Sequence, residues 1–438
     1  MKLGIRIGIE LEITTEPQAV ATGWSVDSRT VAEGDLFFAL KGPRHDGHDH
    51  VPEALRKGAV GVVVERPCGA GGWEFVVNDT LAALQGLAAE ARIEWNGEVV
   101  GVTGSAGKTS TKDAIARLLE TGLRVGKSEG NLNNHVGLPL SILRLPDECQ
   151  AAVLEMGMNH SGEIRVLAGM ARPDVAVVTN VGWAHTENFR SIDGVAAAKR
   201  ELVESLGPDG VAVLNGDDER VAGFDAPRRI LYGFGENADV RARNVEAGPE
   251  GARFEVDGVR FEIPQAGRHA VSNVLAGVAV ARIFDLPLAD LVEAARTLAA
   301  GAMRGQRMET RGITIWNDCY NSNPEAARSM IDVLAATPAR RRVAVLGEML
   351  ELGRESERLH RETGRYARSR GIDAFVGIRG AARFMVEEAS GAAYFFESPE
   401  EAGEFLRGFL REGDAVLFKG SRGVAVEKSL ARVVEARD

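Results

Sequence analysis

The sequence lacks the features that mark several large classes of protein. Only three of its 438 residues are cysteine, and Cys68, Cys149 and Cys319 stand far apart. An odd number of widely spaced cysteines predicts neither a disulfide framework nor a zinc site. This usage is typical of a reducing compartment, so we expect a cytoplasmic protein.

Long apolar runs are also missing. No stretch approaches the roughly 20 residues that cross a bilayer as a helix. The segment 1–17 has an apolar stretch, but Arg6, Glu10 and Glu12 interrupt it, and this is not the pattern of a signal peptide. The sequence therefore predicts no membrane partner, and residues 1–20 receive no role.

Basic residues do not outnumber acidic ones. The chain has 52 Lys and Arg against 63 Asp and Glu, which gives a net charge of −11. A general nucleic-acid binder needs a positive surface for the phosphate backbone, so no nucleic-acid partner is expected. A local basic pocket for a phosphorylated ligand is compatible with this charge.

The sequence does contain a regular alternation of strand and helix patterns, in a chain too long for one ordinary domain. Apolar runs of strand length at 151–157, 173–182 and 211–218 are separated by helical stretches. This alternation is typical of a mainly parallel, doubly wound sheet. We expect three α/β domains: a small N-terminal domain at 1–97, a central P-loop-type domain with such a sheet at 98–302, and a C-terminal Rossmann-like domain at 303–438.

One stretch, VVGVTGSAGKTS at 99–110, has the composition of a phosphate-binding loop between a strand and a helix. Small residues let backbone N–H groups approach phosphate oxygens, and the following helix adds the positive end of its dipole. Lys108 can reach the outer phosphates and Thr109 can bind Mg²⁺. The strict pattern is not met, because Val102 stands where its first glycine belongs. No N-K-x-D motif follows, which weakens a regulatory GTPase interpretation.

Three further polar residues follow or flank the later strands. Glu155 ends the run AAVLE, where a carboxylate can complete a Mg²⁺ shell. His185 lies in the loop after another strand, and such a histidine is more often structural. Lys199 lies among alanines on a helix and, taken alone, is an ordinary helix lysine.

Together these motifs resemble the Mur ligases, the ATP-dependent amide-forming enzymes of peptidoglycan synthesis. The resemblance spans nearly the whole chain and follows the family's motif order. It rests on VDSRTVAEGDLFFALKGPRHDGHDHV (26–51), TGSAGKTS (103–110), EGNLNNHVGLPLSIL (129–143), LEMGM (154–158), TNVGWAH (179–185), AAAKREL (196–202), GRHAVSNVLA (267–276), NDCYNSNPEA (317–326) and LGEMLELG (346–353).

The resemblance implies a reaction. The last two motifs are most similar to the family member that adds D-alanyl-D-alanine. ATP would phosphorylate the terminal carboxylate of UDP-N-acetylmuramoyl-tripeptide, and the amine of the dipeptide would then attack this acyl phosphate. The implied partners are these two small-molecule substrates, and the implied cofactors are ATP and two Mg²⁺ ions. Nothing in the sequence demands more than a monomer.

The resemblance also implies roles for individual residues. Lys199 would carry a carbamate that supports the second metal ion, Asn273 would contact the adenine, Arg307 the phosphates and Asp318 the ribose. The implied catalytic residues are Lys108, His185, Lys199 and Arg307. The implied nucleotide contacts are Gly104, Ser105, Ala106, Gly107, Lys108, Thr109, Ser110, Asn273, Arg307 and Asp318. The implied metal ligands are Thr109, Glu155, His185 and Lys199. The implied substrate contacts are Ser28, Arg29, Tyr320, Asn321 and Asn323.

The chain departs from the family pattern at a few positions, and other functions stay open. Ala270 stands where asparagine is frequent, Ser322 where alanine is usual, and Glu348 where aspartate is frequent. The alternatives are the neighbouring amino-acid-adding Mur ligase, folylpolyglutamate synthase and a P-loop binding protein without ligase activity. The chain lacks the D-N-P-R motif of the first and has an N-terminal motif that the second lacks. The ordered Glu155, His185 and Lys199 argue against the third.

Overall fold

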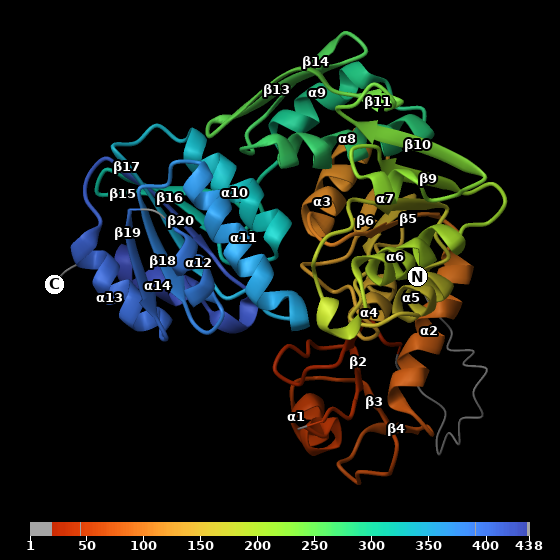
Figure 1. The fold of residues 1–438 in the computed structure, drawn as a ribbon. Coiled ribbons are helices and arrows are strands. Elements are labelled where there is room, and N and C mark those ends of the chain that lie inside the picture. Colours follow the sequence, from red (N-terminus) through yellow and green to blue (C-terminus); the bar gives the residue numbers. More distant parts are fainter. Residues whose placement is uncertain (1–19, 44, 390, 436–438) are drawn as a thin grey trace.

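The computed structural model describes residues 20–43, 45–389 and 391–435. The segment 1–19, in which the sequence predicts no targeting signal, lies outside the described residues. Figure 1 shows three regions with sheets of their own: the N-terminal region in red to orange, the middle region in orange through yellow to green, and the C-terminal region in cyan to blue. None of the helices in the described residues is long and apolar enough to cross a membrane.

The N-terminal region is a four-stranded parallel sheet in the order β1-β2-β3-β4. Its elements are β1 (Gly23–Ser25), β2 (Asp35–Phe38), η1 (Gly47–His50), α1 (Val51–Arg56), β3 (Gly61–Val64), β4 (Trp73–Val76) and α2 (Thr80–Trp95). Strands β2 and β3 are buried throughout, as expected for apolar runs in a parallel sheet covered on both faces. One apolar cluster packs against α2 and the other against α1.

Helix α2 connects this region to the middle one. Asp79 caps its first turn by accepting two backbone N–H bonds, which satisfies donors that would otherwise lack partners. Near its other end, Arg92 donates to the Ala171 carbonyl at 2.7 Å and the Trp95 indole donates to the Cys149 carbonyl at 3.0 Å. The helix is therefore fixed to the middle region by its C-terminal turns.

The middle region is a seven-stranded sheet in the order β11-β10-β9-β8-β5-β7-β6, and all of its strand pairs are parallel. Its elements are β5 (Glu98–Thr103), α3 (Lys108–Leu119), β6 (Val125–Lys127), α4 (Gly137–Leu143), β7 (Ala151–Glu155), α5 (Glu163–Ala171), β8 (Val175–Val178), η2 (Thr186–Asn188), α6 (Ile192–Glu204), β9 (Val211–Asn215), α7 (Glu219–Ala222), β10 (Arg228–Gly233), β11 (Val240–Arg241), α8 (Arg268–Ile283) and α9 (Leu288–Arg296). Helices α3, α8 and α9 pack on one face, and α2, α4, α5 and α6 on the other. Both faces are covered, so the strands read as continuous apolar runs.

A small antiparallel sheet interrupts this pattern between β11 and α8. It consists of β12 (Arg243–Gly248), β13 (Gly251–Val256) and β14 (Val259–Ile263). Phe254 and Phe261 stack at 5.4 Å and join the core that contains α8 and α9. The turn between β12 and β13 faces the C-terminal region, where Glu250 pairs with Arg307.

The C-terminal region is a six-stranded sheet in the order β15-β16-β20-β17-β18-β19. Its elements are β15 (Gln306–Thr310), β16 (Ile313–Asp318), α10 (Pro324–Ala336), β17 (Arg341–Gly347), η3 (Gly353–Glu355), α11 (Ser356–Ser369), β18 (Ala374–Ile378), α12 (Ala382–Glu388), β19 (Ala392–Phe396), α13 (Pro399–Phe409), β20 (Asp414–Lys419), η4 (Arg422–Val424) and α14 (Glu427–Val434). Only β15 runs antiparallel, as a hairpin with β16. The expected fold class, three α/β domains with a doubly wound central sheet, is confirmed.

Candidate active site

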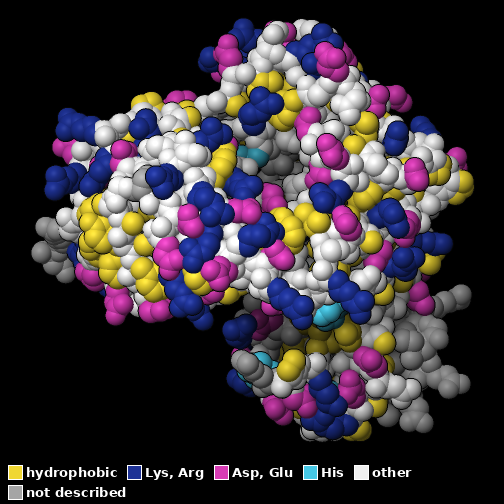
Figure 2. Space-filling view, in the orientation of Figure 1, with side chains coloured by type: hydrophobic (Ala, Val, Ile, Leu, Met, Phe, Trp, Pro, Cys, Tyr) yellow, Lys and Arg dark blue, Asp and Glu magenta, His cyan; other side chains and the backbone are white. Residues whose placement is uncertain are grey.

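A cavity of about 1050 Å³ lies between the middle and C-terminal regions. Figure 2 shows the surface hollowed at this junction. Its wall comes from the loop before α3, the ends of β7, β8 and β9, helix α8, the linker before β15 and the segment between β16 and α10. The site therefore lies where parallel sheets place ligands, beyond the carboxyl ends of the strands.

The loop from Gly104 to Gly107 can be built only with glycine at its two ends. Gly104 has φ +152°, and a Cβ there would lie 1.8 Å from the Thr179 hydroxyl oxygen. Gly107 has φ +80°, and a Cβ there would lie 2.9 Å from the Asn273 amide oxygen. Both glycines combine an unfavourable φ for other residues with a close neighbour. Packing and backbone conformation therefore both require glycine at the two ends of the G-x-x-G order.

Residues between the glycines are held by the segment that follows β8. The Ser105 hydroxyl donates to the Gly182 carbonyl at 3.0 Å and accepts from the Gly182 N–H at 2.8 Å. The Ala106 N–H donates to the Asn180 side chain at 2.9 Å. Helix α3 begins directly afterwards at Lys108, so its first N–H groups have no helical partner and face the cavity. This is a cradle for a phosphate group.

Lys108 folds back over this loop. Its ammonium donates to the Gly104 carbonyl at 2.8 Å. Burial lowers the pKa of Lys108, and the carboxylate of Glu155 opposes that shift. An anionic ligand could replace the Gly104 carbonyl as the partner of the Lys108 ammonium.

Thr109 and Glu155 form a pair of oxygen ligands beside the loop. The Thr109 hydroxyl donates to Glu155 Oε2 at 2.7 Å, and Asn133 Nδ2 donates to Glu155 Oε1 at 2.7 Å. A hydroxyl and a carboxylate suit Mg²⁺, which takes one or two protein carboxylates and fills its shell with water and phosphate oxygens. The described residues hold no group of three or more His, Cys, Asp or Glu side chains that forms a metal site unaided. The donor set therefore fits a Mg²⁺ ion that arrives with a phosphorylated ligand.

His185 lies in the cavity wall and contacts the C-terminal region. It has φ +59°, in the left-handed region that few non-glycine residues adopt. Its Nδ1 lies 2.5 Å from Glu351 Oε2, and this contact holds the pKa of Glu351 below its usual range. The neighbouring Glu187 N–H donates to the Glu351 carbonyl at 2.9 Å. The loop after β17 thus fixes the histidine from across the domain boundary.

Lys199 is buried on α6, with 2% of its surface exposed. Burial and the charge of Lys108 together push the pKa of Lys199 well below its usual range. It forms no ion pair with a carboxylate of the described residues and does not line the cavity. The helix lysine is therefore not an ordinary surface lysine.

The residues expected to bind the nucleotide are only partly brought together. Asn273 and Asp318 both line the cavity. Asn273 accepts a bond from Thr111 at 3.1 Å, and Asp318 is held by Lys419 at 2.5 Å. Two of the predicted nucleotide contacts, Gly104 and Arg307, do not line the cavity. Arg307 is exposed on β15 and pairs with Glu250 at 3.3 Å.

The predicted dipeptide contacts do lie in the cavity wall. Tyr320, Asn321 and Asn323 follow β16 and face the phosphate loop across the domain junction. Asn323 caps α10 by accepting from the Ala326 N–H at 2.8 Å, and its Nδ2 donates to the Ser105 carbonyl at 3.3 Å. One side chain therefore begins a C-terminal helix and contacts the middle region.

The predicted contacts to the UDP end lie away from this cavity. Ser28 donates to Glu53 at 2.7 Å, and Arg29 pairs with Asp27 at 2.6 Å on the surface of the N-terminal region. Neither lines the cavity. The structure therefore leaves their role as a prediction.

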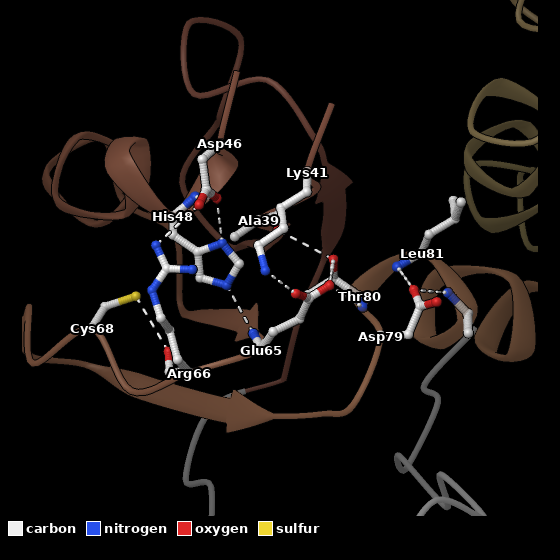
Figure 3. Close-up of polar contacts among 11 residues, drawn as sticks. Ala39, Lys41, Asp46, His48, Glu65, Arg66, Cys68, Asp79, Thr80 and Leu81 are labelled. Carbon is white, nitrogen blue, oxygen red and sulfur yellow. Dashed lines mark hydrogen bonds and ion pairs between the residues drawn. The ribbon is translucent and has the colours of Figure 1, made fainter. Parts of the chain in front are cut away.

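Figure 3 shows how the histidine-rich loop of the N-terminal region is held. The buried His48 ring contacts Asp46 at 2.6 Å through Nδ1, and its Nε2 accepts the Glu65 N–H at 2.8 Å. Lys41 and Arg66 pair with Glu65 and Asp46 respectively. Both ring nitrogens of His48 are used within the fold, so this histidine is a structural one.

Sequence reasoning missed several residues of the cavity wall. Arg304 and Lys419 line it, as does Asn133. Asn133 lies in one of the motifs that carry the family resemblance, but the resemblance implies no role for it. Lys419 is the last residue of the apolar strand β20, just as Glu155 is the last residue of β7, so its position at the strand end was the available signal. Arg304 stands three residues before Arg307, and no pattern in the linker distinguishes the two.

The comparisons with known proteins agree with this geometry. The chain matches the Mur ligase family catalytic domain over residues 21–129, the Mur ligase middle domain over 102–281 and the Mur ligase glutamate ligase domain over 303–422. It is 36% identical to the UDP-N-acetylmuramoyl-tripeptide–D-alanyl-D-alanine ligase of Bacillus subtilis, over 96% of this chain and 94% of that one.

Solved structures give the same result. MurF from Acinetobacter baumannii superposes with a TM-score of 0.89 at 32% identity and covers 96% of this chain and 95% of its own. The MurF ligase from Thermotoga maritima in complex with ADP superposes with a TM-score of 0.83 at 31% identity, over 94% and 97% of the two chains. With fold, phosphate loop and full-length similarity in agreement, the chain belongs to the Mur ligase family.

Proposed function

We propose that the chain is an ATP-dependent ligase that joins D-alanyl-D-alanine to UDP-N-acetylmuramoyl-tripeptide during peptidoglycan precursor synthesis. The observation that carries this proposal is the 36% identity to a ligase of that activity over nearly the full length of both chains. The cavity supports this proposal, because the phosphate loop forms one wall and the segment between β16 and α10 forms another. We place the reaction in the cytoplasm and take the monomer as the working unit.

The proposed division of labour follows the regions. Residues 1–97 would bind the UDP-sugar, with Ser28 and Arg29 at its UDP end. Residues 98–302 would bind ATP, and residues 303–438 would bind the dipeptide and part of the nucleotide.

The first step is phosphoryl transfer. The carboxylate oxygen of the tripeptide attacks the γ-phosphorus of ATP, and the bond from that phosphorus to the β–γ bridging oxygen breaks to release ADP. Such a step is accelerated mainly by positioning and by positive charge around the transferred group. Lys108 and the N–H groups that begin α3 supply both, and Asn273 and Asp318 would hold the nucleoside.

Thr109 and Glu155 would hold one Mg²⁺, which neutralises phosphate charge and orients the phosphate oxygens. His185 and Lys199 would support a second ion. For that role the neutral Lys199 amine would add to carbon dioxide, forming an N–C bond and releasing one proton, so that a buried amine becomes an anionic carbamate. The depressed pKa of Lys199 favours the neutral, nucleophilic amine that this requires.

The second step forms the amide. The free amine of D-alanyl-D-alanine attacks the acyl carbon, the bond from that carbon to the phosphate oxygen breaks, and phosphate and one proton leave. Tyr320, Asn321 and Asn323 would orient the dipeptide, and Asn323 already contacts the phosphate loop. Positioning the amine beside the acyl phosphate is the main contribution that these side chains can make.

The test is ATP-dependent phosphate release by the purified protein with Mg²⁺ and UDP-N-acetylmuramoyl-tripeptide, with and without D-alanyl-D-alanine. We expect release that requires the dipeptide, and a product heavier than the acceptor by the dipeptide less one water. Release with UDP-N-acetylmuramoyl-dipeptide and a single amino acid would instead assign the preceding step. No release with any acceptor would contradict a ligase function.

A further inference from the structure

One acidic side chain of the cavity wall has not been given a role. Glu325 lies in the first turn of α10 and lines the cavity. It follows Tyr320, Asn321 and Asn323, the predicted dipeptide contacts, in the same segment, and the family resemblance implies nothing for it. Its carboxylate is therefore a charged group of the cavity whose partner is still to be found.

A second helix of the C-terminal region shows the same local sequence with a different outcome. Helices α10 and α13 both begin with a capping side chain, a proline and a glutamate. In α13 this glutamate is Glu400, which lies outside the cavity and forms an ion pair with Lys428 at 2.8 Å. In α10 it is Glu325, with which no Lys, Arg or His of the described residues forms an ion pair; the guanidinium of the nearby Arg328 pairs with Glu362 instead. The helix terminus favours an acidic residue at both positions, but only Glu325 lacks a cation.

The middle region fixes the position of this carboxylate. The Trp183 N–H donates to both oxygens of Glu325, at 3.1 and 3.2 Å. A Cβ at Gly182 would lie 2.6 Å from the Glu325 carboxyl carbon, so the carboxylate packs directly against this backbone. Gly182 in turn bonds the Ser105 side chain of the phosphate loop through its N–H and its carbonyl. One shared N–H uses only part of the acceptor capacity of a carboxylate, so Glu325 can accept further bonds beside the segment that braces the phosphate loop.

The surroundings of Glu325 favour a cationic ligand. Burial raises the pKa of this carboxyl group, because its charged form is desolvated. A cation placed against the carboxylate would offset that cost, and the described residues supply none. An ammonium group suits the position, since it donates charge-assisted bonds to carboxylate oxygens.

We propose that Glu325 binds the ammonium group of the incoming D-alanyl-D-alanine and holds it beside the phosphate loop. The inference deepens the proposed function and rests on it for the identity of the ligand. The location fits the reaction, because the nitrogen must come next to an acyl phosphate whose phosphoryl group would lie at the loop from Gly104 to Gly107. Glu325 would thus set the end of the dipeptide that reacts, and the side chains that precede it in the segment would orient the rest.

Titration calorimetry tests this proposal without turnover, on the full chain saturated with Mg²⁺, a non-hydrolysable ATP analogue and UDP-N-acetylmuramoyl-tripeptide. The two probes are D-alanyl-D-alanine and propionyl-D-alanine, which has a hydrogen atom in place of the amino group. The unaltered chain is expected to bind the dipeptide about tenfold or more tightly than propionyl-D-alanine, the usual value of a charge-assisted hydrogen bond. Glu325→Gln should weaken dipeptide binding by the same factor and leave propionyl-D-alanine binding unchanged, because glutamine can still accept the Trp183 N–H.

The matched control is Glu400→Gln, which removes the same charge at the same helix position outside the cavity and should leave both affinities unchanged. Unchanged dipeptide affinity in Glu325→Gln, or equal affinity of the unaltered chain for the two probes, would overturn the proposal. An equal loss for both probes in Glu325→Gln would also overturn it and would assign Glu325 to the contact between the regions alone. Glu325-dependent dipeptide binding by a chain that releases no phosphate would contradict the proposed function and leave this inference standing.

Discussion

At the scale of single residues, Lys199 shows how burial changes what a side chain can do. A lysine on a helix is usually a solvated cation, but this one lies against the sheet with 2% of its surface exposed. No described carboxylate pairs with it, and Lys108 repels its charged form. Burial without a paired carboxylate favours the neutral amine of Lys199, and the neutral amine is the form that reacts with carbon dioxide.

Lys199→Ala should therefore nearly abolish turnover. We expect kcat to fall by roughly a hundredfold or more, in the range seen when a group that stabilises transition-state charge is removed. Added bicarbonate should not restore activity, because the variant has no amine to modify. The measurement is phosphate release under saturating substrates, with ADP affinity as the control for folding. Turnover close to that of the unaltered enzyme would remove Lys199 from the mechanism.

The same residue should make stability depend on pH. The folded-state pKa of Lys199 is lowered relative to the unfolded chain, so the unfolded state binds more protons as the pH falls below the ordinary lysine value. The contribution of Lys199 to stability is therefore highest above that value and is lost as the pH falls toward its folded-state pKa. Lys199→Met removes this penalty with a side chain of similar length.

In buffer free of carbon dioxide, Lys199→Met should raise the free energy of unfolding near neutral pH, by about 1–4 kcal/mol if it behaves like other replacements of buried ionic groups by apolar ones. The gain should shrink as the pH approaches the ordinary lysine pKa. Denaturant unfolding at several pH values measures both effects. A gain that does not vary with pH would indicate packing rather than ionisation as its cause.

At the scale of elements, the phosphate loop depends on a partner segment that the sequence places far away. The loop between β5 and α3 is braced by the segment after β8 through Ser105, Ala106 and their partners. Asn323, at the start of α10, adds a contact from the C-terminal region. The loop therefore has a defined shape before any ligand binds, as a preorganised anion site requires.

Gly104→Ala tests this bracing. Its Cβ would collide with the Thr179 hydroxyl at 1.8 Å, and its φ of +152° is unfavourable for alanine. We expect ADP affinity to fall by roughly tenfold or more, because the loop must shift to relieve the clash. Gly104→Ala combined with Thr179→Ala should recover part of that affinity, since the hydroxyl is gone while the backbone strain remains. Full recovery of ADP affinity in the double variant would mean that the φ of residue 104 does not matter for binding. Equal ADP affinity in the unaltered protein and in both variants would contradict the bracing of the loop by the segment after β8.

The elements also mark what the sequence could and could not predict. Apolar runs flanked by helical patterns were sufficient to predict the doubly wound sheet and to place Glu155 and Thr109 at its carboxyl edge, because strand ends follow from local composition. The partners of the site residues were not predictable, because tertiary packing brings them from distant segments: Asn133 to Glu155, Glu351 to His185 and Lys419 to Asp318. The linker shows this limit most clearly. Arg304 and Arg307 cannot be told apart from the sequence, whereas in the structure Arg304 lines the cavity and Arg307 pairs with Glu250 outside it.

At the scale of the whole molecule, the middle and C-terminal regions are already joined along one edge of the cavity. Asn323 contacts the phosphate loop, the Glu325 carboxylate accepts from the Trp183 N–H at 3.1 Å, and His185 contacts Glu351. Burial raises the pKa of Glu325, whereas the bond from Trp183 favours its charged form. Arg307 and the N-terminal pair Ser28 and Arg29 do not line the cavity.

Because Arg307 and the N-terminal pair lie outside the cavity, we predict that the regions close around the bound ligands. The Arg307 pair with Glu250 is exposed, with 40% and 74% of the two side chains accessible, and exposed ion pairs of this kind contribute at most about 1 kcal/mol. Exchanging Glu250 for a phosphate would cost little, so ligand binding can pull β15 toward the cavity. We expect the radius of gyration from small-angle X-ray scattering to fall when a non-hydrolysable ATP analogue and UDP-N-acetylmuramoyl-tripeptide are both present. Lys108→Ala should prevent this change by weakening nucleotide binding, whereas Glu250→Gln should leave the closed state accessible. An unchanged radius of gyration in the saturated enzyme would mean that Arg307 acts, if at all, without a change in the arrangement of the three regions.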